Sequence, residues 1–168
     1  MLETAILGLC ALNLVLMAAW LTTGVLDNLL HPFLNETYTA QVLDMERLRG
    51  DYPEAYAFVA YRRISSSKLR GRLFRAIVVW EIVATLALWA SAIIFGLAFL
   101  GGASEATAIA CGLFATGLFI SVWAGFLIAG NYFCYWFGHE GGQNTHFQML
   151  HWGMACAVLL VVAAVAVA

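Results

Sequence analysis

Ionisable and amide side chains within otherwise apolar stretches are the residues of this 168-residue sequence that could carry chemistry. Glu81 lies in one apolar run, and Asn131 and His151 lie in two others. Because an ionisable side chain is costly to place in hydrocarbon, it is expected to face the interior of a helix bundle or a partner. Glu81 is about eight residues into its run, or roughly 12 Å at helical rise. If the runs are antiparallel helices, all three side chains fall at similar depth.

A polar network is the first interpretation of these residues. In it Glu81 is hydrogen-bonded to His151, Asn131 or a tyrosine and holds the helices in register. The second interpretation is a pocket for a quinone or another small molecule, lined by aromatic residues. The aromatic residues expected in such a pocket are Trp80, Tyr135 and Trp136, and the candidates for ligand binding or for the polar network are Glu81, Asn131, Gln143, His146, Gln148 and His151.

A haem or metal site is the third interpretation. Only one apolar run holds a histidine at depth, so bis-histidine ligation of haem would require His31. His139 and Glu140 with His146 lie in a glycine-rich loop without cysteine, which matches metal-site spacing poorly. The sequence contains no phosphate loop, nucleophile triad or dinucleotide fingerprint. We therefore predict no metal, no catalytic residue and no resident cofactor, with haem or quinone as the alternatives.

The composition is that of a membrane protein. Apolar residues make up 63% of the chain and charged residues 11%, and the mean hydropathy is +0.86. Soluble domains have roughly 45–50% apolar and about 25% charged residues. A soluble domain of this size could not bury so much apolar surface. This composition excludes a soluble enzyme, a disulfide-rich secreted scaffold, a disordered tail and a nucleic-acid-binding protein.

Four apolar runs are long enough to cross a bilayer, which takes about 20 helical residues. We predict a single all-α membrane domain, with four transmembrane helices in an antiparallel bundle and short interfacial helices in the first loop. That loop, residues 26–72, is expected to form an extramembrane cap. The predicted crossings are residues 4–25, 73–100, 106–137 and 147–168.

The basic residues indicate an orientation. All eight lie within residues 26–72 or just beyond, and short segments rich in Lys and Arg stay in the cytoplasm. We therefore expect a cytoplasmic cap, two periplasmic termini and a location in the bacterial inner membrane. The N-terminus lacks a basic region, so no cleaved signal peptide is expected. The candidates for binding lipid headgroups are Arg62, Arg63, Lys68, Arg70, Arg72 and Arg75.

Small residues four apart mark one face of the third run. They are Gly117, Ser121, Gly125 and Ala129. Helices in lipid approach closely through small residues, because apolar burial drives their association little. We expect this face to contact another helix of the same chain.

Five stretches resemble a bacterial family of predicted small integral membrane proteins, DUF2165. They are residues 27–32, 42–46, 74–81, 130–136 and 142–147. The resemblance implies a small inner-membrane protein with four helices. It supplies no known activity, so no catalytic role is carried over to this chain.

For function, we predict a non-catalytic accessory subunit of a larger inner-membrane complex, respiratory or photosynthetic. The absence of a reactive set favours this prediction, as do the small-residue face and the 11 Phe, 6 Trp and 6 Tyr residues. The expected partners are membrane lipids and other integral membrane subunits, without nucleic acid. Two alternatives remain: a membrane redox component that binds haem or quinone, and a lipid-binding protein that acts through its basic cap.

Overall fold

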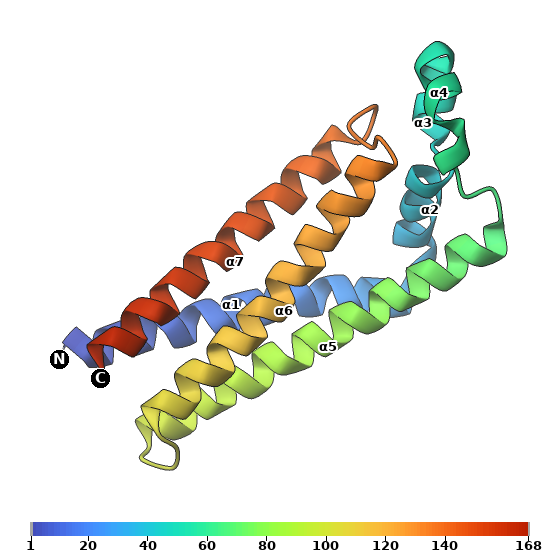
Figure 1. The fold of residues 1–168 in the computed structure, drawn as a ribbon. Helices are drawn as coiled ribbons and strands as arrows, with labels where there is room; N and C mark the ends of the chain where they lie inside the picture. The colour runs from blue at the N-terminus through green and yellow to red at the C-terminus, as the bar shows by residue number, and fades with distance from the viewer. Residues whose placement is uncertain (1, 168) are drawn as a thin grey trace.

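Four long helices form the body of the computed structural model, which describes residues 2–167. They are α1 (Leu2–Leu30), α5 (Ser67–Phe99), α6 (Glu105–Tyr132) and α7 (Glu140–Ala166). Each is long and apolar enough to cross a membrane, so the predicted all-α fold with four transmembrane helices is confirmed. Successive long helices run in alternating directions, and the first turn of α1 lies at the same end of the bundle as the last turn of α7 (Figure 1).

Short helices occupy the segment between α1 and α5. They are α2 (Pro32–Leu43), α3 (Glu46–Asp51), α4 (Pro53–Val59) and the 3-10 turn η1 (Ala60–Arg62). We call residues 31–66 the cap. The cap has a small core of its own around Leu43, Met45 and Leu48, which packs against the turn that follows α6. The short helices expected in this loop are therefore present, and their position at a membrane surface stays a prediction.

Local sequence explains where the long helices begin and end. The Ser66 hydroxyl accepts a hydrogen bond from a backbone amide of the first turn of α5, and Ser104 does the same for α6. The turn between α5 and α6 uses Gly101, whose φ of +77° suits glycine. A serine directly before a helix is expected to form such a capping hydrogen bond, as Ser66 and Ser104 do here.

The long helices have bounds different from those of the predicted crossings. Helix α1 extends to Leu30 rather than 25 and α5 begins at Ser67 rather than 73, so the segment between them is shorter than the predicted 26–72. Helix α6 ends at Tyr132 rather than at 137, and α7 begins at Glu140 rather than at 147. The intervening turn contains two residues with positive φ, Cys134 (57°) and Gly138 (99°). Hydropathy placed the end of the third crossing too far along the chain. The aromatic run after Tyr132 is as hydrophobic as the helix before it, but it packs into the cap core.

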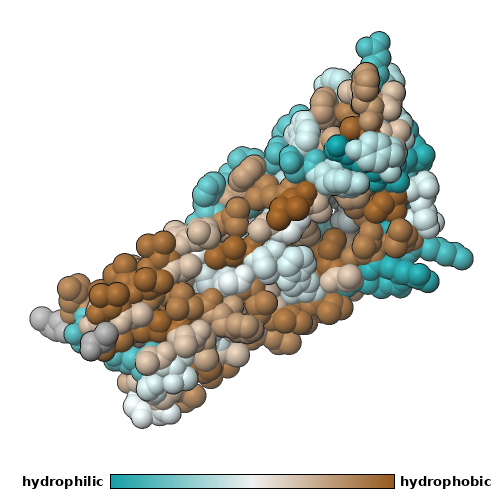
Figure 2. All heavy atoms as spheres, in the orientation of Figure 1, coloured by the Kyte–Doolittle hydropathy of each residue, from teal (hydrophilic) through white to brown (hydrophobic). Residues whose placement is uncertain are grey.

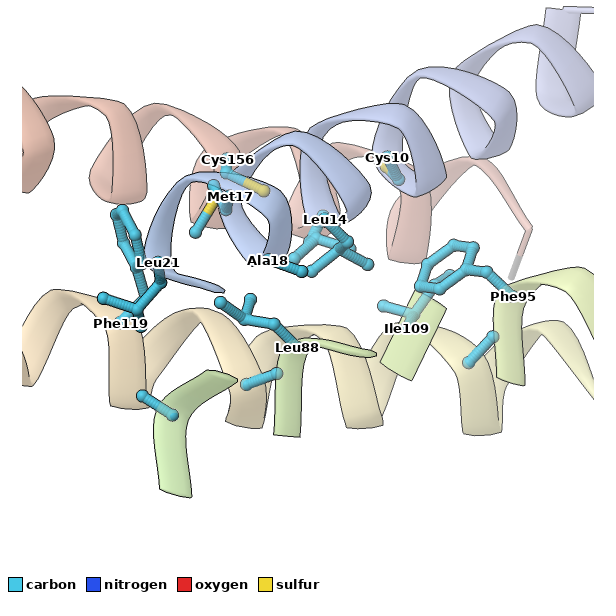
Figure 3. Packing of buried hydrophobic residues seen from close by; sticks show 14 of the residues in the cluster. Cys10, Leu14, Met17, Ala18, Leu21, Leu88, Phe95, Ile109, Phe119 and Cys156 are labelled. Carbon is cyan, nitrogen blue, oxygen red and sulfur yellow. The ribbon is translucent and has the colours of Figure 1, made fainter. Parts of the chain in front are cut away.

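The half of the bundle nearest the termini has a closed hydrophobic core. Leu14 from α1, Leu88 and Phe95 from α5, and Phe119 from α6 are at most 1% exposed. Their side chains meet between the helices in Figure 3, together with residues of α7. All four cysteines are free, and three of them are buried. Buried apolar side chains fill this half, apart from a smaller hollow of about 200 Å³ beside Leu7, Phe95 and Glu105 at its end.

The predicted small-residue face contacts another helix of the same chain over part of its length. Gly125 faces the ring of Trp80 from α5, and the Trp80 indole donates a hydrogen bond of 3.2 Å to Ser121. Gly117 faces open space, and Ala129 is exposed. Half of the face therefore packs against α5, and the rest is open.

Two other glycines lie where α6 and α7 leave no room for a side chain. A Cβ atom on Gly112 would lie 2.9 Å from Leu160, and one on Gly153 would lie 2.7 Å from Ile120. Both distances are too short for a real side chain. These two glycines therefore set the separation of α6 and α7 in the closed half of the bundle.

Candidate functional site

A cavity of about 490 Å³ lies between the cap and the adjoining end of the bundle. Its wall is formed by α1, α2, α5, α6, α7 and the turn after α6. The volume lies within the roughly 300–1,000 Å³ of small-molecule sites, and most of the lining is aromatic or aliphatic. The lining residues with polar groups include Asn28, Asn35, Tyr38, Glu81, Tyr135, Thr145 and His146.

Glu81 is the only acidic residue of the cavity wall, and it is 7% exposed. Asn28 of α1 donates a hydrogen bond of 2.7 Å to its carboxylate. Asn35 of α2 donates one of 2.7 Å to the amide oxygen of Asn28. This chain of bonds joins three helices and orients the carboxyl group. The wall contains no Lys or Arg.

The α6 and α7 side of the wall is aromatic and surrounds His146. The His146 ring is stacked on Phe126 at 4.8 Å between centroids and lies 5.7 Å from Trp123 and 6.0 Å from Tyr135. Three buried polar atoms here have no hydrogen-bond partner: His146 Nδ1, Trp123 Nε1 and Tyr135 Oη. A buried polar atom without a partner costs about 1–3 kcal/mol. A ligand with hydrogen-bonding groups could satisfy these atoms.

Burial shifts the titration of the groups beside the cavity that lie outside the long helices. It raises the pKa of Tyr135 to about 12. Burial and then the charge of Glu140 raise the pKa of Tyr38. Burial and then the charge of Arg47 lower the pKa of His139, whose ring packs edge-on against Tyr38 at 4.8 Å. Near neutral pH both phenols are therefore protonated and His139 is neutral.

Two of the six predicted site residues, Glu81 and His146, line the cavity together. The predicted hydrogen bond from Glu81 to His151, Asn131 or a tyrosine is wrong, because its partner is Asn28. His151 follows His146 by five residues, which turn a helix by about 140° and place it on another face. Gln143 is half-buried outside the wall, and the exposed candidates are Asn131, Gln148 and His151.

Of the three aromatic residues expected around a pocket, one lines the cavity. Tyr135 is part of the wall. Trp80 instead packs against Gly125, and Trp136 packs against the cap core. The wall takes its other aromatic rings from positions that hydropathy alone does not distinguish from lipid-facing ones.

Asn28 is a wall residue that the sequence analysis missed, although the sequence contains a signal for it. Leu21, Val25 and Asn28 are spaced i, i+4 and i+7 on one face of α1, and all three are buried. Asn28 therefore continues an apolar stripe with a polar residue, as Glu81 does on α5. Asn35 and Tyr38 have no comparable signal, because they reach the cavity only through the fold of the cap.

Three of the predicted headgroup-binding residues are engaged by protein groups. Asp44 accepts hydrogen bonds from Arg63 at 2.9 Å and from Arg70 at 3.1 Å, and also from Arg49. Arg62 donates to the backbone carbonyl of residue 132 at 3.1 Å. These contacts tie the cap to α5 and to the end of α6.

The other three predicted headgroup-binding residues form one exposed basic face. Lys68, Arg72 and Arg75 are spaced i, i+4 and i+7 on the first turns of α5. The ion pairs between described residues all involve Asp44, so these three side chains have none. They are available to anionic groups outside the chain.

Among residues 2–167, no cluster of three or more His, Cys, Asp or Glu side chains could hold a metal ion. No curated protein and no solved structure matches the chain. A family described as predicted small integral membrane protein (DUF2165) matches residues 8–163. The matched residues include all of α5 and α6, most of α1 and α7, and the whole cavity wall. The chain therefore belongs to this family of multi-pass membrane proteins, whose function is unknown.

Proposed function

We propose that the protein is a non-catalytic membrane protein that binds a small, largely apolar organic molecule in the cavity between cap and bundle. The observation that carries this proposal is the cavity itself: about 490 Å³ with aromatic walls and a few converging polar groups. Such a combination is typical of small-molecule sites. A helix bundle that needed only to be stable in lipid would gain from filling this space.

The polar groups lie on two sides of the wall and would orient the ligand. Glu81 and Asn28 come from α5 and α1, whereas Tyr135, His146 and Trp123 belong to α6, α7 and the turn between them. A ligand with polar groups at two positions around an apolar body could engage both sides.

A quinone suits this wall better than a haem does. Its carbonyl oxygens could accept hydrogen bonds from the unpartnered Tyr135 hydroxyl and Trp123 indole. Haem needs axial ligands, and His146 is the only histidine of the wall. The redox component is therefore a second candidate function, with quinone as its ligand.

Membership of a larger respiratory or photosynthetic complex stays a prediction. The long helices expose apolar side chains such as Leu86, Ile93 and Val158, which suit lipid tails and partner helices equally. Ligand binding and complex membership are compatible, since this chain by itself supplies the residues that line the cavity.

We also propose that the protein lies in the bacterial inner membrane with the cap in the cytoplasm and both termini in the periplasm. The basic residues at the cap end support this orientation. Lys68, Arg72 and Arg75 would then contact anionic headgroups, each contributing about 1 kcal/mol. Reporter fusions at the two termini test the orientation, and a cytoplasmic reporter signal at either end would contradict it.

Filling the cavity tests the proposed function. Ile77 lines the cavity and Ile93 faces outward on the same helix, so Ile77→Trp and Ile93→Trp form a matched pair. We expect the purified wild type and Ile93→Trp to bind decylubiquinone or another small apolar probe. Ile77→Trp should bind at least tenfold more weakly, as measured by quenching of tryptophan fluorescence. Equal affinity of both variants would contradict binding in the cavity.

A further inference from the structure

We propose that the natural ligand of the cavity is an organic ammonium cation with apolar substituents, whose positive charge lies against Glu81. The inference rests on the proposed function and adds the chemical class of the ligand. Three observations carry it: a buried carboxylate without an ion-pair partner among the described residues, a wall without Lys or Arg, and aromatic faces around the same space.

Among residues 2–167, no Lys, Arg or His side chain forms an ion pair with the carboxylate of Glu81. Its hydrogen bond comes from Asn28, whose amide is neutral. The ion pairs between described residues all converge on Asp44, and His146 is held among aromatic rings instead. A buried charge without a partner is strongly destabilising, and acidic residues in membrane helices are therefore usually paired. A cationic ligand would supply the missing charge.

The aromatic rings of the wall provide the second half of an ammonium site. Phe74, Trp123 and Phe126 line the cavity together with two tyrosines. The face of an aromatic ring attracts a cation by about 0.5–2 kcal/mol, and cages of such rings recognise quaternary ammonium groups. Apolar substituents on the cation would occupy the rest of the space. An anionic ligand would be repelled by Glu81, and the wall has no Lys or Arg to offset the repulsion.

Two sources could supply an ammonium group with apolar substituents. One is the headgroup of phosphatidylcholine or phosphatidylethanolamine, and the other is a free lipophilic amine. The shared chemistry is the cation, and the experiment below separates the two sources.

Two probes of equal shape and opposite charge test the proposal without any variant. Delipidated protein in a non-ionic detergent is titrated with tetraphenylphosphonium and with tetraphenylborate, and tryptophan fluorescence is followed. We expect the cation to bind at least tenfold more tightly than the anion. Glu81→Gln should abolish this preference for the cation. Glu81→Asp, which keeps the charge, should retain it.

The control variant is Glu105→Gln, which removes a carboxylate at the opposite end of the bundle and should change nothing. Equal binding of both ions, or a preference that survives Glu81→Gln, overturns the cation proposal. If Ile77→Trp still weakens the neutral probe in that case, the proposed function stands. If Ile77→Trp has no effect on any probe, both fail. The comparison of the two ions in the wild type decides even where Glu81→Gln does not fold.

Lipid competition identifies the source. Displacement of tetraphenylphosphonium by phosphatidylcholine or phosphatidylethanolamine, but not by phosphatidylglycerol, assigns the site to a lipid headgroup. Displacement by none of the three lipids assigns it to a free lipophilic cation. Either result supports an ammonium site. Displacement by phosphatidylglycerol alone overturns it, because that headgroup is anionic.

Discussion

The two ends of the bundle are built from the same four helices and have opposite interiors. Near the termini, Leu88, Phe95 and Phe119 are almost completely buried and the core is closed. Near the cap, the helices surround a cavity of about 490 Å³ that contains Glu81 and Asn28. Hydrophilic residues gather at this cap end, whereas the long bundle is largely hydrophobic on the face shown in Figure 2.

The contrast shows how helix packing in lipid can reserve space for a ligand. Gly112 and Gly153 let α6 and α7 approach closely in the closed half. Toward the cap, Trp123 and Phe126 stack around His146, and α2 covers the space that remains. Packing is the main source of stability between membrane helices. The unfilled space near the cap therefore makes that half of the bundle less stable than a fully packed one would be.

Truncating a core ring should have the largest effect. Phe119 is 0% exposed in the closed half, whereas Phe126 lines the cavity and already lacks contacts on one side. We expect Phe119→Ala to lower the free energy of unfolding by about 3 kcal/mol, and Phe126→Ala to lower it by less. Unfolding in mixed detergent micelles measures both. Equal costs would contradict the contrast between the two halves.

Removing the Asp44 carboxylate should loosen the cap over the cavity. Asp44 binds three arginines that are partly exposed, so Asp44→Asn should destabilise cap docking by roughly 1–2 kcal/mol. Faster hydrogen exchange of the backbone amides in residues 44–66 would reveal the change. Asp51→Asn serves as control, because Asp51 is exposed and has no ion pair with the described residues. Unchanged exchange in Asp44→Asn would mean that the apolar cap core alone holds the cap.

Replacing a glycine in the first turn of α7 by alanine should perturb the cavity mildly. A Cβ atom on Gly142 would overlap the Tyr38 hydroxyl, whereas one on Gly141 would meet open space. Because the overlap involves the far end of the Tyr38 side chain in the cavity wall, we expect Gly142→Ala to weaken probe binding a few-fold, or by about 1 kcal/mol. Gly141→Ala should bind like the wild type. The same titration as above measures both variants, and equal behaviour would exclude Tyr38 from the binding surface.

Lowering the pH should have the smallest effect, a slight weakening of the docking of the cap on the bundle. Burial and Arg47 lower the pKa of His139 in the docked cap, although Glu140 and Glu46 oppose this shift. The undocked state therefore binds more protons, and docking weakens as the pH falls below about 6.5, the ordinary value for histidine. Above that pH His139 contributes no pH dependence. Amide protection factors of the cap measure the effect, and His139→Phe, which keeps the packing against Tyr38, should remove it.

Several features were predictable because they depend on nearby residues. The four crossings follow from apolar length, and the start of α6 follows from Ser104 as its capping residue. Glu81 was expected in the interior because a charged group in lipid must avoid the hydrocarbon. The family resemblance rested on local stretches of sequence and was also confirmed.

Other features depend on how distant residues meet. The end of α6 moved to Tyr132 because the following aromatic residues found a core in the cap. His151 and Asn131 match Glu81 in predicted depth, but both face outward. Depth along a helix is set by residue count, whereas the face that points inward depends on the rotation of each helix against its neighbours.

The amino-acid sequence alone determined that this chain spans a membrane four times, carries its positive charges at one end and buries an acidic residue near that end. Hydropathy, helix length and the cost of burying charge act along the chain and need no knowledge of neighbours. Only the tertiary structure decided that Asn28 would bind Glu81, that His146 rather than His151 would share its cavity, and that α2 would cover it. Such contacts arise from the rotation and separation of packed helices, which many weak contacts between distant residues set together.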